Sequence, residues 1–205
     1  MKSAVAKILV VGALASGLSG CIGLVLTGAA VGVLAVTDRR TIGAQAEDQG
    51  IEFRASDVLR NKLNSSGGIS VTSFNRKVLL SGQVLDEQAK RDAESLISKV
   101  DNVRGVFNEL AVSGRASFGT NTVDAAITTK VKAFFLEASD LSPNVFKVVT
   151  ESGTVYLMGI TTQREGSRAA EVASRVSGVS KVVTLFEYVT DEELARIEAM
   201  NRVKK

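Results

Sequence analysis

The sequence predicts an α+β fold, built as a tandem repeat of two small α-β-β-α-β units and followed by a C-terminal helix. Two observations predict it. Helix-spaced and alternating apolar residues follow one another in the same order in two stretches, 49–114 and 122–189. Matching residues in these stretches are 77 or 76 positions apart. The remaining divisions are an export signal at 1–20, a tether at 21–48 and the helix at 190–205.

The first 20 residues have the pattern of a secretory signal peptide. Lys2 and Lys7 precede an apolar stretch at 8–18, and small residues lie before the single cysteine, Cys21. Residues 18–21, Leu-Ser-Gly-Cys, resemble a bacterial lipobox, in which the cysteine is acylated and the peptide before it is removed. We therefore expect the mature chain to begin at a lipid anchor on Cys21.

Apolar residues continue past Cys21 as far as Val36, so an uncleaved transmembrane helix is the alternative. Glycines recur throughout this stretch, and each weakens a helix by up to about 1 kcal/mol relative to alanine. Several acyl chains would hold the protein firmly in a membrane without a transmembrane helix, because each buried methylene contributes about 0.8 kcal/mol. Position 22 is Ile and not Asp. By resemblance to lipoprotein sorting in double-membraned bacteria, this implies the outer membrane.

The predicted tether, residues 21–48, ends in a polar stretch. Residues 37–49 contain no large apolar side chain apart from Ile42. Arg39 and Arg40 follow Cys21 by 18 and 19 residues. They either reach lipid headgroups or are solvated charges of the tether.

The first unit, residues 49–114, predicts the element order helix, strand, strand, helix, strand. Apolar residues at helical spacing end at a Ser-Ser-Gly-Gly sequence, which breaks the helix. Apolar and polar residues then alternate on both sides of a turn, as in two strands. An alanine-rich stretch at helical spacing precedes the last strand. The predicted elements are a helix at 49–63, strands at 69–73 and 78–84, a helix at 86–100 and a strand at 103–112.

The second unit, residues 122–189, repeats this order. Its predicted elements are a helix at 122–138, strands at 145–150 and 155–159, a helix at 163–176 and a strand at 179–189. Gly82 of the first unit matches Gly159 of the second at an offset of 77. We expect both glycines to be structural, because a missing side chain lets a helix cross closely or allows a bulge, with ligand contact as the alternative.

Residues 190–205 predict a C-terminal helix. Thr190 and Glu193 have the spacing of a capping box, and basic residues lie at the end of the segment. Leu194, Ile197 and Met200 form a narrow apolar seam. We expect this helix to dock on the second unit. A helix that binds a partner or lies on the membrane surface is the alternative.

Composition narrows the function classes. The chain has 25 basic and 22 acidic residues, and loss of Lys2 and Lys7 with the signal leaves a net charge of about +1. Because the two signs are interleaved, we expect no nucleic-acid partner. The chain has no histidine, which is the commonest general base and metal ligand, and its one cysteine is assigned to the anchor. We expect no enzyme, metal or cofactor, with a serine–lysine dyad as the enzymatic alternative.

The repeated residues resemble the BON domain. Its pattern of Val-x-Leu-x-Gly, an alanine-rich helix and then Val-Ser-Gly-Val is present at 78–82, 155–159 and 176–179. The order of a lipobox, Asp-Arg-Arg-Thr at 38–41 and two such units is similar to the DolP/YraP family of dual-BON outer-membrane lipoproteins. The resemblance implies a periplasm-facing protein that binds anionic phospholipid through its second domain. It also implies support of outer-membrane integrity and a location at the division site.

The helix at 122–138 carries more apolar residues than one core face needs. A helical projection gives a buried stripe of four residues. Its members are Val123, Ile127, Val131 and Phe134. Phe135 lies at the edge of this stripe, and Leu136 lies nearly opposite it, beside Lys132. We expect Lys132, Phe135 and Leu136 to contact anionic phospholipid, because apolar groups enter the headgroup boundary while an ammonium pairs with the headgroup.

One departure from the family and one alternative concern the same helix. Family members commonly carry a tryptophan near its start, whereas this chain has Ala126 there and no tryptophan anywhere. In the alternative, Phe135 and Leu136 pack against the first unit or the C-terminal helix. The rival function is a lipid-anchored adaptor for envelope assembly or stress-response proteins.

Overall fold

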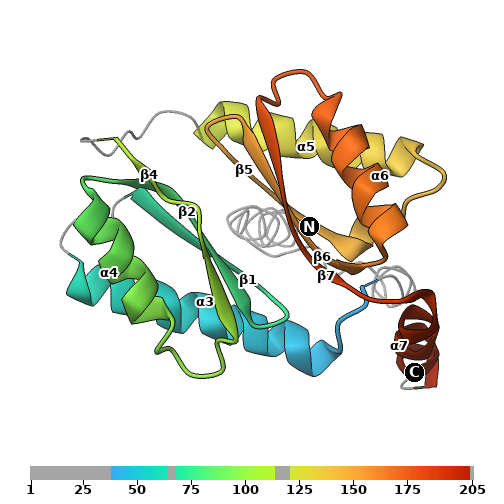
Figure 1. The fold of residues 1–205 in the computed structure, drawn as a ribbon, viewed down its shortest axis with the longest axis horizontal. Coiled ribbons are helices and arrows are strands. Elements are labelled where there is room, and N and C mark those ends of the chain that lie inside the picture. Colours follow the sequence, from blue (N-terminus) through green and yellow to red (C-terminus); the bar gives the residue numbers. More distant parts are fainter. Residues whose placement is uncertain (1–37, 64–67, 114–120, 204–205) are drawn as a thin grey trace, which may run out of the picture. The chain divides into compact units, whose positions relative to one another are not determined.

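The computed structural model describes residues 38–63, 68–113 and 121–203, and their fold is shown in Figure 1. The α+β class and the tandem repeat are confirmed. The predicted signal peptide and Cys21 lie outside the described residues. Domain 1 comprises α3 (Ile42–Lys62), β1 (Ile69–Phe74), β2 (Lys77–Val84), α4 (Glu87–Ile97), β3 (Gly105–Asn108) and β4 (Ala111–Val112). Domain 2 comprises α5 (Asn121–Glu137), η3 (Pro143–Val145), β5 (Phe146–Glu151), β6 (Thr154–Thr161), α6 (Gln163–Ser174) and β7 (Lys181–Tyr188), and α7 (Asp191–Val203) follows it.

Each domain is an antiparallel hairpin with a third strand added in parallel. In domain 1, β1 pairs with β2 from Ile69 opposite Gly82 to Phe74 opposite Lys77, and β3 and β4 lie parallel to β2. In domain 2, β5, β6 and β7 repeat this order. A parallel strand needs a crossover, which α4 and α6 provide. The predicted strand at 103–112 is divided into β3 and β4, and buried Leu110 lies between them.

The predicted tether is too long, because α3 begins at Ile42 rather than near residue 49. Thr41 caps the helix, since its side-chain oxygen accepts a hydrogen bond from the Ala44 amide at 3.1 Å. The early turns gave no hydrophobic signal because their large apolar residue, Ile42, is 79% exposed, while the buried residue is Asp48. Residues 38–48 are therefore part of the folded domain.

A buried aspartate on the first helix of each domain holds the hairpin turn. Asp48 accepts two turn amides in domain 1, and Asp124 accepts two in domain 2, all at 2.7–2.9 Å. The four amides belong to Asn75, Arg76, Ser152 and Gly153. All four residues have positive φ, as both central positions of a type I′ turn require. The repeat therefore includes a helix-to-hairpin clamp.

The two matching glycines are approached by backbone rather than by a crossing helix. Gly82 has a φ of +108°, and a Cβ there would lie 1.8 Å from the carbonyl oxygen of Gly68. A Cβ at Gly159 would lie 3.0 Å from the carbonyl oxygen of Val145. In both domains the neighbour is the residue just before the first strand of the hairpin. The hairpin pairing leaves no room for a side chain at Gly82 and crowds one at Gly159.

The two domains share a hydrophobic cluster. Val78 and Leu80 of β2 face the core under α3 and α4, and Val155 and Leu157 of β6 face the core under α5 and α6. The alternate residues of these strands face the other way. With neighbouring side chains they form one shared cluster, whose buried members are Phe74, Leu79, Tyr156, Met158, Ile160 and Leu185. The domains therefore pack together through the sheet faces that the helices leave uncovered.

The C-terminal helix α7 begins with the predicted capping box, which is confirmed. The Thr190 amide donates to Glu193 at 2.9 Å, and the Glu193 amide donates to the Thr190 hydroxyl at 3.2 Å. Ile197 packs against the shared cluster. Asn201 donates to the carbonyl oxygen of Arg39 at 3.2 Å. The helix therefore contacts the shared cluster and the segment before α3.

Candidate functional site

Residues four apart form the buried face of α5. Ile127, Val131 and Phe135 are 3%, 0% and 0% exposed, and all three belong to the core of domain 2. The Phe135 ring lies 5.3 Å from the ring of Phe146, between centroids. Residues four apart advance by about 40° around a helix, so this stripe drifts along α5.

The prediction that Phe135 contacts lipid is therefore wrong, and so is its packing against the first unit. The predicted stripe is centred too close to Ile127 and takes in Val123 and Phe134, which are 63% and 41% exposed. The observed stripe is centred nearer Val131. This rotation brings Phe135 into the core and turns Phe134 outward.

The exposed part of α5 carries two pairs of a lysine and an apolar residue. The members of each pair are four residues apart, and the two pairs lie on opposite flanks of the exposed part. Lys132 precedes Leu136, which is 73% exposed, and Lys130 precedes Phe134. Residues four apart lie next to each other on a helix surface. Neither lysine forms a salt bridge within the described part of the chain. We call Lys130, Lys132, Phe134 and Leu136 the α5 surface.

Arg39, expected in the tether, is buried against domain 2. It is 8% exposed, and its guanidinium makes a bidentate ion pair with Glu165 at 2.8 and 2.9 Å. It also donates to the carbonyl oxygen of Ile160 at 2.9 Å and lies 3.5 Å from Glu198 of α7. Arg39 therefore joins the segment before α3 to β6, α6 and α7.

Arg40, the next residue, is bound to domain 1. It donates to Asp48 at 2.9 Å and to Asp38 at 2.7 Å, and its guanidinium carbon lies 4.1 Å from the centroid of the Phe74 ring. Such a position over an aromatic face is attractive for a cation. The expectation that Arg39 and Arg40 are solvated or reach headgroups is wrong, because their partners are side chains of the two domains.

The ion pair sets the charge state of Glu165. Burial raises the pKa of this carboxyl group, but hydrogen bonds from Arg39 and from the Thr162 amide outweigh burial and lower the pKa to about 2. The same carboxylate completes the capping box of α6 with Thr162. Glu165 is therefore ionised at neutral pH and serves both the helix and the contact with Arg39.

Within residues 38–63, 68–113 and 121–203, no cluster of three or more His, Cys, Asp or Glu side chains is placed to hold a metal ion. Within the same ranges, no helix combines the length and the hydropathy of a bilayer span.

The buried roles of Asp48, Asp124 and Arg39 were not predicted from the sequence. The two aspartates carry a signal that could have been used, because they are 76 positions apart and so recur in the repeat. A charged residue at the same place in both copies of a buried stripe indicates a bonded buried group. Arg39 carries no comparable signal, because its partner is 126 positions away.

Comparison with known proteins identifies the repeat. The BON domain family model matches residues 47–114 and 123–190. The chain is 36% identical over 174 residues to the outer membrane lipoprotein DolP of Haemophilus influenzae, covering 84% of this chain and 90% of that protein. It is 34% identical over 154 residues to a 21 kDa hemolysin of Actinobacillus pleuropneumoniae, covering 74% of this chain and 79% of that protein.

A third relative is the osmotically-inducible protein Y of Escherichia coli, 31% identical over 146 residues, which cover 69% of this chain and 72% of that protein. The two matched domains together span well over half of the chain. The similarity to DolP extends over nearly the whole length of both proteins. The chain therefore belongs to the BON domain family, as a dual-BON outer-membrane lipoprotein of the DolP/YraP type.

Proposed function

We propose that this lipoprotein is non-catalytic, is anchored through acylated Cys21, and binds anionic phospholipid through the α5 surface of domain 2, in support of outer-membrane integrity. The observation that carries the proposal is the exposure of Leu136 beside Lys132. Phe134 and Lys130 repeat this pairing on the same helix. Phe134 takes the place of Phe135 in the lipid contact.

The chemistry of the α5 surface suits the headgroup region of a bilayer. Burying an exposed leucine or phenylalanine is worth roughly 1.5–3 kcal/mol at most. A lysine near an anionic surface adds about 1 kcal/mol. These contributions give weak, reversible binding. Such binding is sufficient for a protein that an acyl anchor already holds at the membrane, because the anchor raises the local lipid concentration.

Vesicle sedimentation tests the proposal. Residues 36–205 form a compact unit, so we expect a protein that begins at Val36, and therefore lacks Cys21, to keep the described fold. We expect it to sediment with vesicles containing phosphatidylglycerol, less so at higher salt, and not with phosphatidylcholine vesicles. The double substitution Phe134→Ser and Leu136→Ser is expected to weaken binding by at least roughly tenfold.

The matched control replaces two apolar residues of similar exposure outside the α5 surface. Leu85→Ser and Met200→Ser, at positions 48% and 58% exposed, are expected to leave binding unchanged. Equal sedimentation of the Phe134 and Leu136 variant and the parent contradicts the proposal. If that variant instead loses a defined envelope protein while keeping the lipid, the adaptor function is supported.

A further inference from the structure

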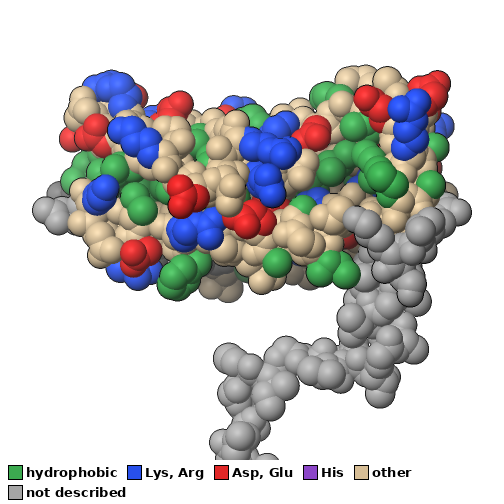
Figure 2. All heavy atoms as spheres, turned by 90° about the horizontal axis from the view of Figure 1, so that it is seen from below, with side chains coloured by type: hydrophobic (Ala, Val, Ile, Leu, Met, Phe, Trp, Pro, Cys, Tyr) green, Lys and Arg blue, Asp and Glu red, His purple; other side chains and the backbone are tan. Residues whose placement is uncertain are grey.

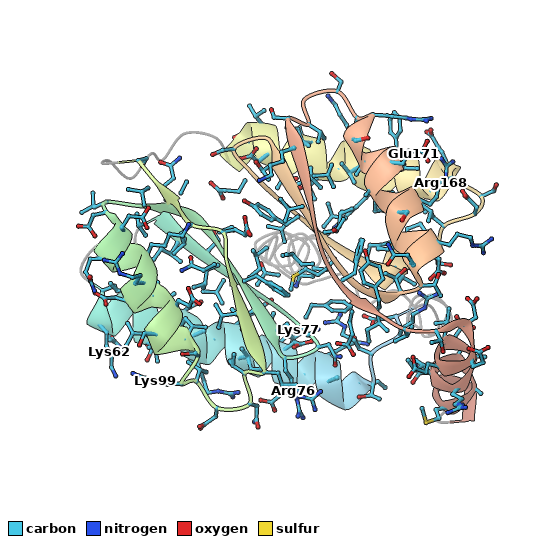
Figure 3. All side chains as sticks on the ribbon, in the orientation of Figure 1. Lys62, Arg76, Lys77, Lys99, Arg168 and Glu171 are labelled. Atoms are coloured by element: carbon cyan, nitrogen blue, oxygen red, sulfur yellow. The ribbon has the colours of Figure 1, made fainter. Side chains whose placement is uncertain are left out.

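Domain 1 has a groove between the C-terminal halves of α3 and α4. It encloses a cavity of about 350 Å³. Its apolar lining comprises Phe53, Val58, Leu96 and Val100, and Lys62 and Lys99 lie at the same cavity. Both lysines lie at one corner of domain 1 in Figure 3, at the end of α3 and just after α4. The groove therefore combines apolar and basic side chains.

Two large apolar side chains on the outer side of α3 are exposed. Phe53 is 77% exposed and Ile42 is 79% exposed. They are 11 residues apart, which is about three helical turns, so they lie on one side of α3 about 16 Å apart. On the face seen in Figure 2, hydrophobic side chains lie among basic and acidic ones. Of the two, Phe53 lines the groove, so its exposed ring adds to the apolar lining there.

The charges of the groove favour an anionic ligand. The ionised side chains of its lining carry a net charge of +1. Arg54 is held by Glu47 at 2.7 Å, and Asp57 lies 3.8 Å from Arg60. Lys62 and Lys99 form no salt bridge with any residue that the structure describes. Two lysines are thus available to a phosphate group.

We propose that this groove is a second phospholipid contact, in which Phe53 enters the headgroup boundary and Lys62 and Lys99 bind the headgroup of an anionic lipid. The position of the groove in the chain favours a bilayer as its partner. The helix that carries Phe53 starts 21 residues after Cys21, the proposed anchor, and it is the first element that the structure describes. The inference does not depend on the α5 surface, which belongs to the other domain.

Single tryptophans test the groove, because the chain contains no tryptophan. The substitutions Phe53→Trp in the groove, Phe134→Trp on the α5 surface and Leu85→Trp as a control are made separately in residues 36–205. With phosphatidylglycerol vesicles, the emission of Phe53→Trp is expected to shift to shorter wavelength and to be quenched by brominated acyl chains. Leu85→Trp is expected to change in neither respect.

Charge substitutions test the role of the lysines. In the Phe53→Trp protein, Lys62→Gln with Lys99→Gln is expected to weaken the response to anionic vesicles by roughly fivefold per lysine. Lys90→Gln with Lys181→Gln removes the same charge elsewhere and is expected to leave the response unchanged. Lys62 also lies in the last turn of α3, where a cation stabilises a helix end. A purely structural role predicts a lower Tm with unchanged binding, which overturns the assignment of the lysines.

The reporters separate the two lipid proposals. A response of Phe53→Trp alone supports the groove and contradicts the α5 surface. A response of Phe134→Trp alone does the reverse. If neither tryptophan variant responds to the vesicles, both lipid proposals are contradicted. A response of Phe53→Trp to polyglutamate, with none to anionic vesicles, identifies an acidic peptide as the partner and overturns the phospholipid contact.

Discussion

Arg39 and Glu165 make a bidentate ion pair although 126 positions separate them in the sequence. Their side chains are only 6% and 21% exposed. In such a setting, the removal of one partner leaves the other charge desolvated and unpaired. The pair is therefore more sensitive to substitution than the exposed ion pairs of the same protein, which contribute little.

The ionised Glu165 carboxylate stabilises the folded protein, and this stabilisation is lost in acid. Its pKa in the folded state, about 2, is below the ordinary value of 4.5. The stabilisation is therefore complete above about pH 5 and is lost as the pH falls towards 2. We expect Glu165→Gln to lower the free energy of unfolding at pH 7 by on the order of 2 kcal/mol and to flatten its decline below pH 5. Urea unfolding at a series of pH values measures both effects.

Glu171, on the same helix, is the matched control. It pairs with Arg168, at 2.9 Å, and with Arg175 on the exposed side of α6. Figure 3 labels Glu171 and Arg168. We expect Glu171→Gln to change the free energy of unfolding much less than Glu165→Gln does, because solvent screens this pair. Identical pH profiles for the parent and Glu165→Gln would contradict the role assigned to the buried pair.

Among elements, α5 offers a direct test of which side faces the core. Phe134 and Phe135 are neighbours of the same type, yet one is 41% exposed and the other is fully buried. We expect Phe135→Ala to cost about 3–5 kcal/mol in the free energy of unfolding and Phe134→Ala less than about 1 kcal/mol. Urea unfolding of the two variants measures the difference. A larger loss for Phe134→Ala would reverse the assignment.

The element order was predictable from the sequence, whereas the orientation of α5 was predicted incorrectly from that helix alone. Its apolar residues are compatible with two stripe centres, and periodicity does not choose between them. The repeat resolves the choice. At an offset of 76, Phe135 corresponds to Leu59 and Ile127 to Ile51, and these two residues of α3 are also buried. Comparing the copies position by position would have placed Phe135 in the core.

At the scale of the whole molecule, the shared cluster couples the two domains. Met158 of β6 is 1% exposed within it. We expect residues 36–205 to unfold in one transition, with core amides of β2 and β6 exchanging at the same free energy. Met158→Ala is expected to lower both values together by about 2–5 kcal/mol. Hydrogen exchange measures them, and a loss confined to domain 2 would show that the domains unfold independently.

The sequence contains a sign of this packing, but not of its partner. Residues 78–80 and 155–160 are almost continuously apolar, which is typical of a strand buried on both faces. Because each repeat supplies its own helices, one face of each of these strands is expected to be covered by the helices of the same domain. The covering of the other face depends on contacts across the two copies, and these do not appear as local periodicity.

The adjacent arginines have a mechanical consequence. Arg39 is bound to domain 2 and α7, whereas Arg40 is bound to domain 1. Both precede the first turn of α3. Tension applied to the amino-terminal end of the chain is therefore divided between two folded domains before it can unwind a helix. Residues 38–40 thus fasten the start of the described fold to both domains at once.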